Sequence, residues 1–128
     1  MRASFKTAFA LFFGACVSAV AIHELHAQAK PVAYAVAELD VSDPDGFTKE
    51  FGPLAIKALT DAGGKQIVRG GKTVSIFGDA PKGRVTIWQF ESLEKIQAAY
   101  ASPAFIEAKK IGDKYAKFRV YAVEGLPQ

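Results

Sequence analysis

Residues 31–41 read PVAYAVAELDV, and the character of the side chains alternates along the whole run. A period of two predicts a β-strand, because neighbouring side chains of a strand point to opposite faces of the sheet. One set is small and apolar: Ala33, Ala35, Ala37, Leu39 and Val41. The other set begins apolar and aromatic and ends acidic: Val32, Tyr34, Val36, Glu38 and Asp40. A row of alanines suits close packing of helices, so we expect helices on that side.

The residues after this strand predict a helix. Asp43 can cap free backbone amides, and Pro44 fits the first helical position. Apolar residues then recur at helical spacing: Phe47, Phe51, Leu54, Ala58 and Ala62. Gly52-Pro53 interrupts this pattern, which predicts a kink or two short helices. Gly63-Gly64 is expected to end the helix.

The middle of the chain predicts neighbouring strands. Residues 65–70 and 73–77 are each expected to be strand, divided by a bulge or a tight turn at Gly70-Gly71. A turn over residues 79–83 then leads into residues 84–90 (RVTIWQF). We expect this last strand to pair with the preceding one as a hairpin.

The final third predicts two helices and a strand. Ser92 is expected to cap the first helix, and Ser102-Pro103 begins a second one that runs to about Tyr115. Residues 117–124 (KFRVYAVE) predict the last strand. The first of these helices carries Leu93, Ile96, Ala99 and Tyr100, and the expected buried residues of the second are Phe105, Ile106 and Ile111.

The predicted order is strand, helix, two strands, helix, strand. Two βαβ-like halves on one antiparallel sheet make a ferredoxin-like α+β fold. Helices cover only one face of such a sheet, yet each strand would turn large side chains outward whichever set faces away from the helices. These sets are Tyr34 and Val36; Val85 and Ile87 or Thr86, Trp88 and Phe90; and Phe118 and Val120 or Arg119, Tyr121 and Val123. A sheet that is apolar on both faces needs a second cover, and we expect a second copy of the chain, which gives a homodimer.

The first 29 residues predict an export signal. A short positive region precedes an uncharged, mostly apolar run over residues 7–22, which is short for a membrane span of roughly 20 residues. Ala27-Gln28-Ala29 is a small-x-small cleavage site, so Lys30 would become the new N-terminus. An uncleaved anchor helix and lipid attachment at Cys16 are the alternatives.

Residues 30–128 are expected to form a single mature domain, periplasmic or secreted, with no stable membrane association after cleavage. Its 99 residues suffice for one hydrophobic core. Without Arg2, Lys6 and Glu24, the chain keeps 14 basic and 12 acidic residues. This balance is too even to favour nucleic acid or an anionic membrane as the main partner.

The expected mature domain contains no histidine and no cysteine, because His23, His26 and Cys16 all precede Lys30. Most side-chain catalysis near neutral pH uses imidazole or thiolate. A metal site would have only oxygen ligands, and the acidic residues lack the loop spacing of a calcium site. We therefore expect no metal and no cofactor.

Seven stretches, in order across the expected mature domain, share a pattern with a known family: Tyr34–Pro44, Gly63-Gly64, Val68–Gly71, Arg84–Leu93, Tyr100–Pro103, Lys114–Ala116 and Val123–Gly125. In these the chain resembles the family called domain of unknown function 1330. The resemblance implies the dimeric α/β barrel fold, which is also that of cofactor-free monooxygenases, small isomerases and haem-handling enzymes. It implies a dimer but no particular reaction. Phe105 stands where the family usually has tyrosine, and Gly112 where many members have arginine.

Arg69 is the first candidate for a binding residue. Its guanidinium group lies beside Gly70-Gly71 and could hold a carboxylate or phenolate through two hydrogen bonds. The alternative is a structural ion pair with Glu38 or Asp40 across the sheet.

Four further residues are candidates for a ligand site, each with a structural alternative. Tyr34 and Glu38 share a strand face, roughly 13 Å apart along the strand. Glu38 is either a general base, with a pKa raised by burial, or a partner of Arg69 or Arg84. Trp88 either stacks on a planar ligand or packs in the core, and Tyr100 either donates into a pocket or lies at the edge of the core.

Two hypotheses from different classes follow. In the first, the protein is an exported, dimeric barrel that binds a small, partly apolar or acidic molecule. In the second, it is a cofactor-independent enzyme of the monooxygenase or isomerase kind, which the lack of histidine disfavours. A closed pocket that joins Arg69, Glu38 and Tyr34 would be the distinguishing feature.

Overall fold

The computed structural model describes residues 30–127, so the expected signal segment lies outside the described residues. In this part of the chain, no helix is both long and apolar enough to cross a membrane. The elements follow in the order β1 (Ala33–Val41), α2 (Pro44–Gly46), the π-helical turn η1 (Phe47–Phe51), α3 (Gly52–Asp61), β2 (Lys65–Arg69), β3 (Arg84–Phe90), α4 (Leu93–Tyr100), α5 (Pro103–Gly112) and β4 (Ala116–Glu124).

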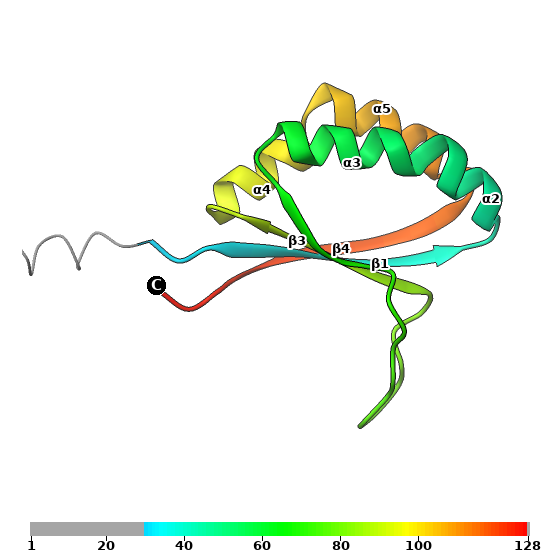
Figure 1. Ribbon diagram of the computed structural model, residues 1–128, viewed down its shortest axis with the longest axis horizontal. Helices are drawn as coiled ribbons and strands as arrows, with labels where there is room; N and C mark the ends of the chain where they lie inside the picture. Colours follow the sequence, from blue (N-terminus) through cyan, green and yellow to red (C-terminus); the bar gives the residue numbers. More distant parts are fainter. Residues whose placement is uncertain (1–29, 128) are drawn as a thin grey trace, which may run out of the picture. The chain divides into compact units, whose positions relative to one another are not determined.

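The four strands form one antiparallel sheet in the order β2-β3-β1-β4. Figure 1 shows the helices as a layer on one face of this sheet, while no element of the described chain covers the other face. The α+β, ferredoxin-like fold predicted from the sequence is confirmed. The long strand β1 lies between β3 and β4, which is why its alternating pattern decides the arrangement of the other elements.

The alanine row of β1 faces the helices, as predicted. Ala33 and Ala35 have no exposed surface, and Ala37 and Leu39 are buried beside them. Because these side chains are small, the helical layer can approach the sheet closely. Larger core residues from the neighbouring elements fill the remaining space: Leu59, Trp88, Phe90, Ile96 and Phe105.

The first helical region begins as predicted, because the Asp43 side chain accepts a hydrogen bond from the Gly46 amide. Its next turn is π-helical, with the Gly52 amide donating to the Phe47 carbonyl five residues earlier. The buried side chains of η1 are Phe47 and Phe51, and those of the following helix α3 are Ala55, Ala58 and Leu59. Leu54, which helical spacing grouped with Phe47 and Phe51, lies off this buried stripe and is 46% exposed.

The helix α5 shows a similar difference. Its buried residues are Phe105, Ala108 and Gly112, at steps of three and four. Ile106 is one position off this stripe and is exposed, so the expectation that it is buried was wrong.

The strand predicted over residues 73–77 is absent. Residues 71–83, here called the arm, carry no strand and project from the end of the sheet between β2 and β3 (Figure 1). A strand needs a neighbour to receive its backbone hydrogen bonds, and the arm extends past the ends of both strands. The strands β2 and β3 do pair antiparallel, but the long arm joins them instead of a tight turn.

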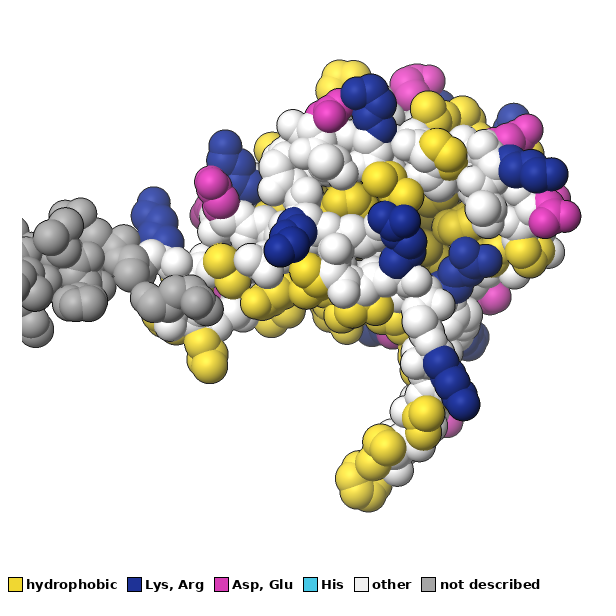
Figure 2. All heavy atoms as spheres, viewed as in Figure 1, with side chains coloured by type: hydrophobic (Ala, Val, Ile, Leu, Met, Phe, Trp, Pro, Cys, Tyr) yellow, Lys and Arg dark blue, Asp and Glu magenta, His cyan; other side chains and the backbone are white. Residues whose placement is uncertain are grey.

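The sheet face away from the helices, here called the outer face, is apolar along its middle. Val36 lies opposite Ile87 on one side and Tyr121 on the other, and Tyr34 lies opposite Val123. Figure 2 shows hydrophobic side chains along this side of the sheet. An ion pair borders them, because Arg119 Nη1 lies 2.9 Å from Glu38 Oε2.

Candidate functional site

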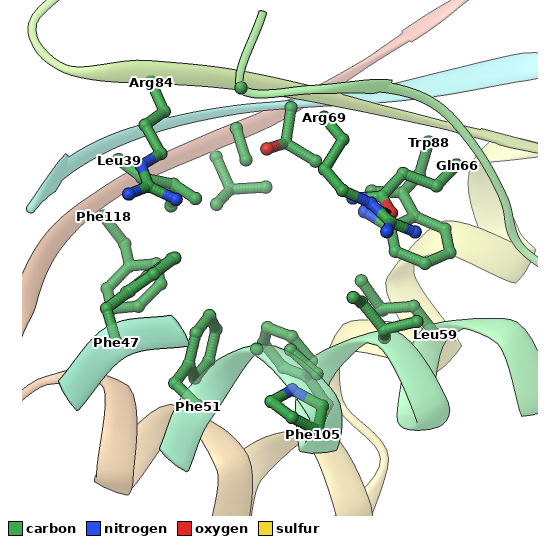
Figure 3. Close-up of a pocket in the computed structure, with 18 of the residues that line it drawn as sticks. Leu39, Phe47, Phe51, Leu59, Gln66, Arg69, Arg84, Trp88, Phe105 and Phe118 are labelled. Atoms are coloured by element: carbon green, nitrogen blue, oxygen red, sulfur yellow. Dashed lines mark hydrogen bonds between the residues drawn. The ribbon is translucent and has the colours of Figure 1, made fainter. Parts of the chain in front are cut away.

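A cavity of about 480 Å³ lies between the helical layer and the sheet. Its walls come from all four strands and from η1, α3, α4 and α5. Figure 3 shows arginine side chains extending from the sheet side and aromatic rings rising from the helix side. The volume falls within the roughly 300–1,000 Å³ typical of small-molecule sites.

Aromatic rings form most of the apolar wall. Phe51 lies 5.0 Å from Phe47 and 5.2 Å from Phe118, measured between ring centroids. The wide turn η1 brings Phe47 and Phe51 together toward the cavity, whereas the indole of Trp88, 3% exposed, closes the opposite end (Figure 3). The wall can therefore accommodate a planar or aliphatic body.

Two arginines supply the charge of the cavity. Arg69 Nε donates a 2.5 Å hydrogen bond to Gln66 Oε1, and the guanidinium carbon of Arg84 lies 5.1 Å above the Phe47 ring. Arg69 lies opposite Thr86, and Arg84 is two residues from Thr86 on the same face of β3, so the two arginines are diagonal neighbours on the sheet. Both project into the cavity from the sheet (Figure 3).

The charge of these arginines is not neutralised by the cavity wall. No Asp or Glu is among the residues that line it, and within residues 30–127 neither Arg69 nor Arg84 forms an ion pair. Guanidinium groups keep their charge and offer several fixed donors. Two positive charges without a counter-ion beside an apolar cavity favour binding of an anionic group.

Tyr100 contributes a hydroxyl group to the same cavity. Burial raises the pKa of Tyr100 to about 12, so the phenol stays protonated near neutral pH. Its ring packs edge-on against Phe105 at 4.6 Å. The phenol can therefore donate a hydrogen bond but does not act as a base at neutral pH.

The five predicted site residues are divided between the two faces of the sheet. Arg69, Trp88 and Tyr100 line the cavity, whereas Tyr34 and Glu38 lie on the outer face. The pairing of β1 with β3 explains this division. Trp88 lies opposite Ala35 and shares its face of the sheet, whereas the neighbouring residue Tyr34 points to the other face. The cavity that Arg69 lines therefore includes neither Tyr34 nor Glu38.

The expected partner of Glu38 was wrong. Neither Arg69 nor Arg84 pairs with it, because Arg119 lies directly across from it on β4 and forms the ion pair. Arg84 lies opposite Leu39, so its side chain points to the helix face.

Sequence reasoning missed most of the cavity wall. Arg84 was considered only as a partner of Glu38, and Gln66, Thr86 and the phenylalanine cluster were not assigned to a site. Alternation along β3 does place Arg84, Thr86 and Trp88 on one face. Which of the two alternating sets of β3 faces the helices depends on how β3 pairs with β1. The sequence of β3 alone does not determine this pairing.

The two departures from the family pattern both lie at this site. Phe105 lines the cavity without the hydroxyl of a tyrosine. A Cβ atom at Gly112 would lie 2.6 Å from the Phe51 ring and 2.8 Å from Phe118. A side chain at position 112 would therefore displace rings of the cavity wall.

The wall offers recognition groups but few reactive ones. It contains no carboxylate, imidazole, thiol or amine side chain. Among residues 30–127, no cluster of three or more His, Cys, Asp or Glu side chains is placed to hold a metal ion. The arrangement can hold an anion and exclude water from an apolar body.

Solved structures of similar fold come from several bacteria. A protein of unknown function from Rhodopseudomonas palustris has a TM-score of 0.59 and 16% identity, over 84% of this chain and 93% of that one. SnoaB, a cofactor-independent oxygenase from Streptomyces nogalater, has a TM-score of 0.52 and 16% identity, over 78% and 97%. A possible oxidoreductase from Bacteroides thetaiotaomicron has a TM-score of 0.50 and 12% identity, over 76% and 100%. At these identities the likeness shows the fold alone.

Sequence comparison gives the family. No curated protein matches the chain significantly. The sequence model of the domain of unknown function 1330 matches residues 32–126, from the start of β1 to just beyond β4. The chain therefore belongs to the family of the domain of unknown function 1330.

Proposed function

We propose that the protein binds a small molecule with an apolar body and one anionic group in the cavity between helices and sheet. The observation that carries this proposal is the pair Arg69 and Arg84 in a wall that has no acidic residue. A carboxylate, phenolate or similar anion would supply the missing counter-charge. Figure 2 shows Lys and Arg side chains beside a hollow with a hydrophobic floor.

The proposed ligand has a defined orientation. Its anionic group lies near Arg69 and Arg84 at the sheet side, and its apolar body lies among Phe47, Phe51 and Phe105 on the helix side (Figure 3). Tyr100 donates a hydrogen bond to a second polar atom of the ligand. A few fixed polar groups in an apolar cavity are typical of small-molecule sites.

An oxygenase-like or isomerase-like activity is the second candidate. The fold similarity to SnoaB, a cofactor-independent oxygenase, supports it. Proton transfer in such chemistry needs a group with a pKa near the working pH, and the cavity wall supplies only the Tyr100 phenol, whose pKa is about 12. Binding is therefore the function that the wall supports better.

Native mass spectrometry of the protein recovered from its own cells tests both proposals, ligand binding and export with cleavage of the signal. We expect a polypeptide that begins at Lys30, since the apolar N-terminal run and Ala27-Gln28-Ala29 support export and cleavage. We also expect a bound organic acid that leaves on denaturation. An empty protein that consumes oxygen with an added phenolic substrate would favour the enzyme, and a polypeptide that begins at Met1 would contradict export.

We also propose that the protein is a homodimer joined through the outer faces of two sheets. The apolar row Ile87, Val36 and Tyr121 supports this interface, because such a row is costly to leave in water. Two identical patches meet naturally about a two-fold axis. Stable interfaces of this kind bury about 1,600 Å² or more in total.

Tyr34→Lys should shift the dimer toward monomer, because it places a charge on the proposed apolar interface of each copy. Sedimentation velocity at micromolar concentration measures the shift. Thr60→Lys, on the exposed side of α3, adds the same charge to the other layer and should leave the dimer intact. A wild-type protein that sediments as a monomer would refute the dimer.

A further inference from the structure

The arm, residues 71–83, presents apolar side chains to solvent. Val74, Ile76 and Phe77 are 70%, 76% and 95% exposed. In Figure 2 the hydrophobic side chains lie toward the tip of the arm. A phenylalanine held almost completely in water has no stabilising role within the described residues, so its position needs another explanation.

The direction of the arm gives that explanation. It leaves β2 after Gly70, returns at Arg84 and points away from the helical layer, toward the side of the outer face (Figure 1). Its return fixes this direction, since a Cβ atom at Gly83 would lie 2.1 Å from the Leu39 carbonyl oxygen, and Gly83 has a φ of 73°. Only glycine fits there, so the base of the arm is tied to β1.

The arm leaves its own outer face uncovered. Tyr121 and Val123 of that face remain 47% and 50% exposed. Two apolar surfaces on the same side of one chain therefore both lack a cover. A second copy seated on the outer face would meet the projecting arm, and by symmetry each arm would meet the other copy.

We propose that the arm of each copy packs against a second copy beside the contact between the two sheets, at the border of that copy's outer face, with Ile76 and Phe77 as its anchors. This inference rests on the dimer proposed above and adds the segment that fastens it. The arm is long enough: six extended residues from Gly71 to Ile76 reach about 20 Å, whereas two stacked sheets lie only about 10 Å apart.

Photo-cross-linking distinguishes the partner copy from other occupants. Phe77 is replaced by p-benzoylphenylalanine in the full chain, and the recovered protein is prepared in ¹⁴N and ¹⁵N forms, dissociated, mixed and allowed to reassociate. We expect cross-linked peptides of mixed isotope that join the arm to β1 or β4. Cross-links within one chain, or none to the outer face, would overturn the inference about the arm. If the protein still sediments as a dimer, the dimer proposal is unaffected by that result. A monomer in sedimentation overturns both.

A charge at the anchor tests the same inference by affinity. Phe77→Asp should raise the dimer dissociation constant about ten- to a hundredfold, the value for losing one buried large apolar side chain. Thr73→Asp places the same charge in the same arm and should change the constant less than threefold. Equal effects of the two variants would overturn the role of Phe77. Both variants should bind 2-naphthoate, a probe with an aromatic body and one carboxylate, in the cavity as the wild type does.

Discussion

Arg69→Ala and Arg84→Ala will each weaken binding of 2-naphthoate by roughly ten- to a hundredfold. Loss of a charge-assisted hydrogen bond typically costs about 1.5–3 kcal/mol, and about 1.4 kcal/mol corresponds to a tenfold change. The double variant should bind 2-naphthoate no better than the uncharged 2-naphthamide. Trp88 is the only tryptophan and lines the cavity, so quenching of its fluorescence measures each affinity.

Arg119→Ala is the matched control for this experiment. It removes the same charge, but from the outer face, where Arg119 pairs with Glu38. Binding of 2-naphthoate should not change. Arg69→Lys keeps the charge and loses the planar pair of donors, so its affinity should fall between those of the wild type and Arg69→Ala.

A purely structural role of Arg69 would lead to a different result for Arg69→Ala. If Arg69 only supports β2, Arg69→Ala lowers the melting temperature and leaves the affinity per folded molecule unchanged. That result would contradict the assignment of the ligand site. We expect a small change in melting temperature, because Arg69 is exposed and its recorded side-chain hydrogen bond is to the nearby Gln66.

Local patterns in the sequence were sufficient to predict the fold. The alternation of residues 31–41 gave the faces of β1, and the caps Asp43, Ser92 and Ser102 marked the starts of helices that the structure contains. These signals depend on residues close in sequence, so they can be read without knowing the tertiary structure. The errors occurred where the structure of a segment depends on its neighbours in space. Residues 73–77 have strand-like composition but pair with no other strand.

The ligand site was harder to predict because its residues come from distant elements. Of the five candidate residues, Arg69, Trp88 and Tyr100 line one cavity, whereas Tyr34 and Glu38 lie on the opposite face of the sheet. Alternation gives two sets of side chains per strand and does not say which sets of different strands coincide. The phenylalanine cluster depends in addition on the π-helical turn, which has no simple signal in the sequence.

Phe51→Ala will be among the most destabilising single substitutions. The ring is buried and packs on Phe47 and Phe118 at 5.0 and 5.2 Å. Such truncations cost about 3–5 kcal/mol, and the lower end applies here because one side of the ring already borders the cavity. For a domain of this size, about 3 kcal/mol corresponds to a fall of roughly 12–24 °C in melting temperature. Leu54→Ala, an exposed position on the same helix, should cost much less.

Gly112→Ala tests the same contact from α5. Alanine is the better helix former, so a stabilisation of about 1 kcal/mol would follow if the position were open. Its Cβ atom would instead lie 2.6 Å from the Phe51 ring, and overpacking of this kind costs about 1–3 kcal/mol. In the Phe51→Ala background that collision is gone and only Phe118 remains close, so Gly112→Ala should cost less there. Urea unfolding of the four proteins measures this coupling. Additive costs would mean that Gly112 and Phe51 do not touch and that the cavity wall is built differently.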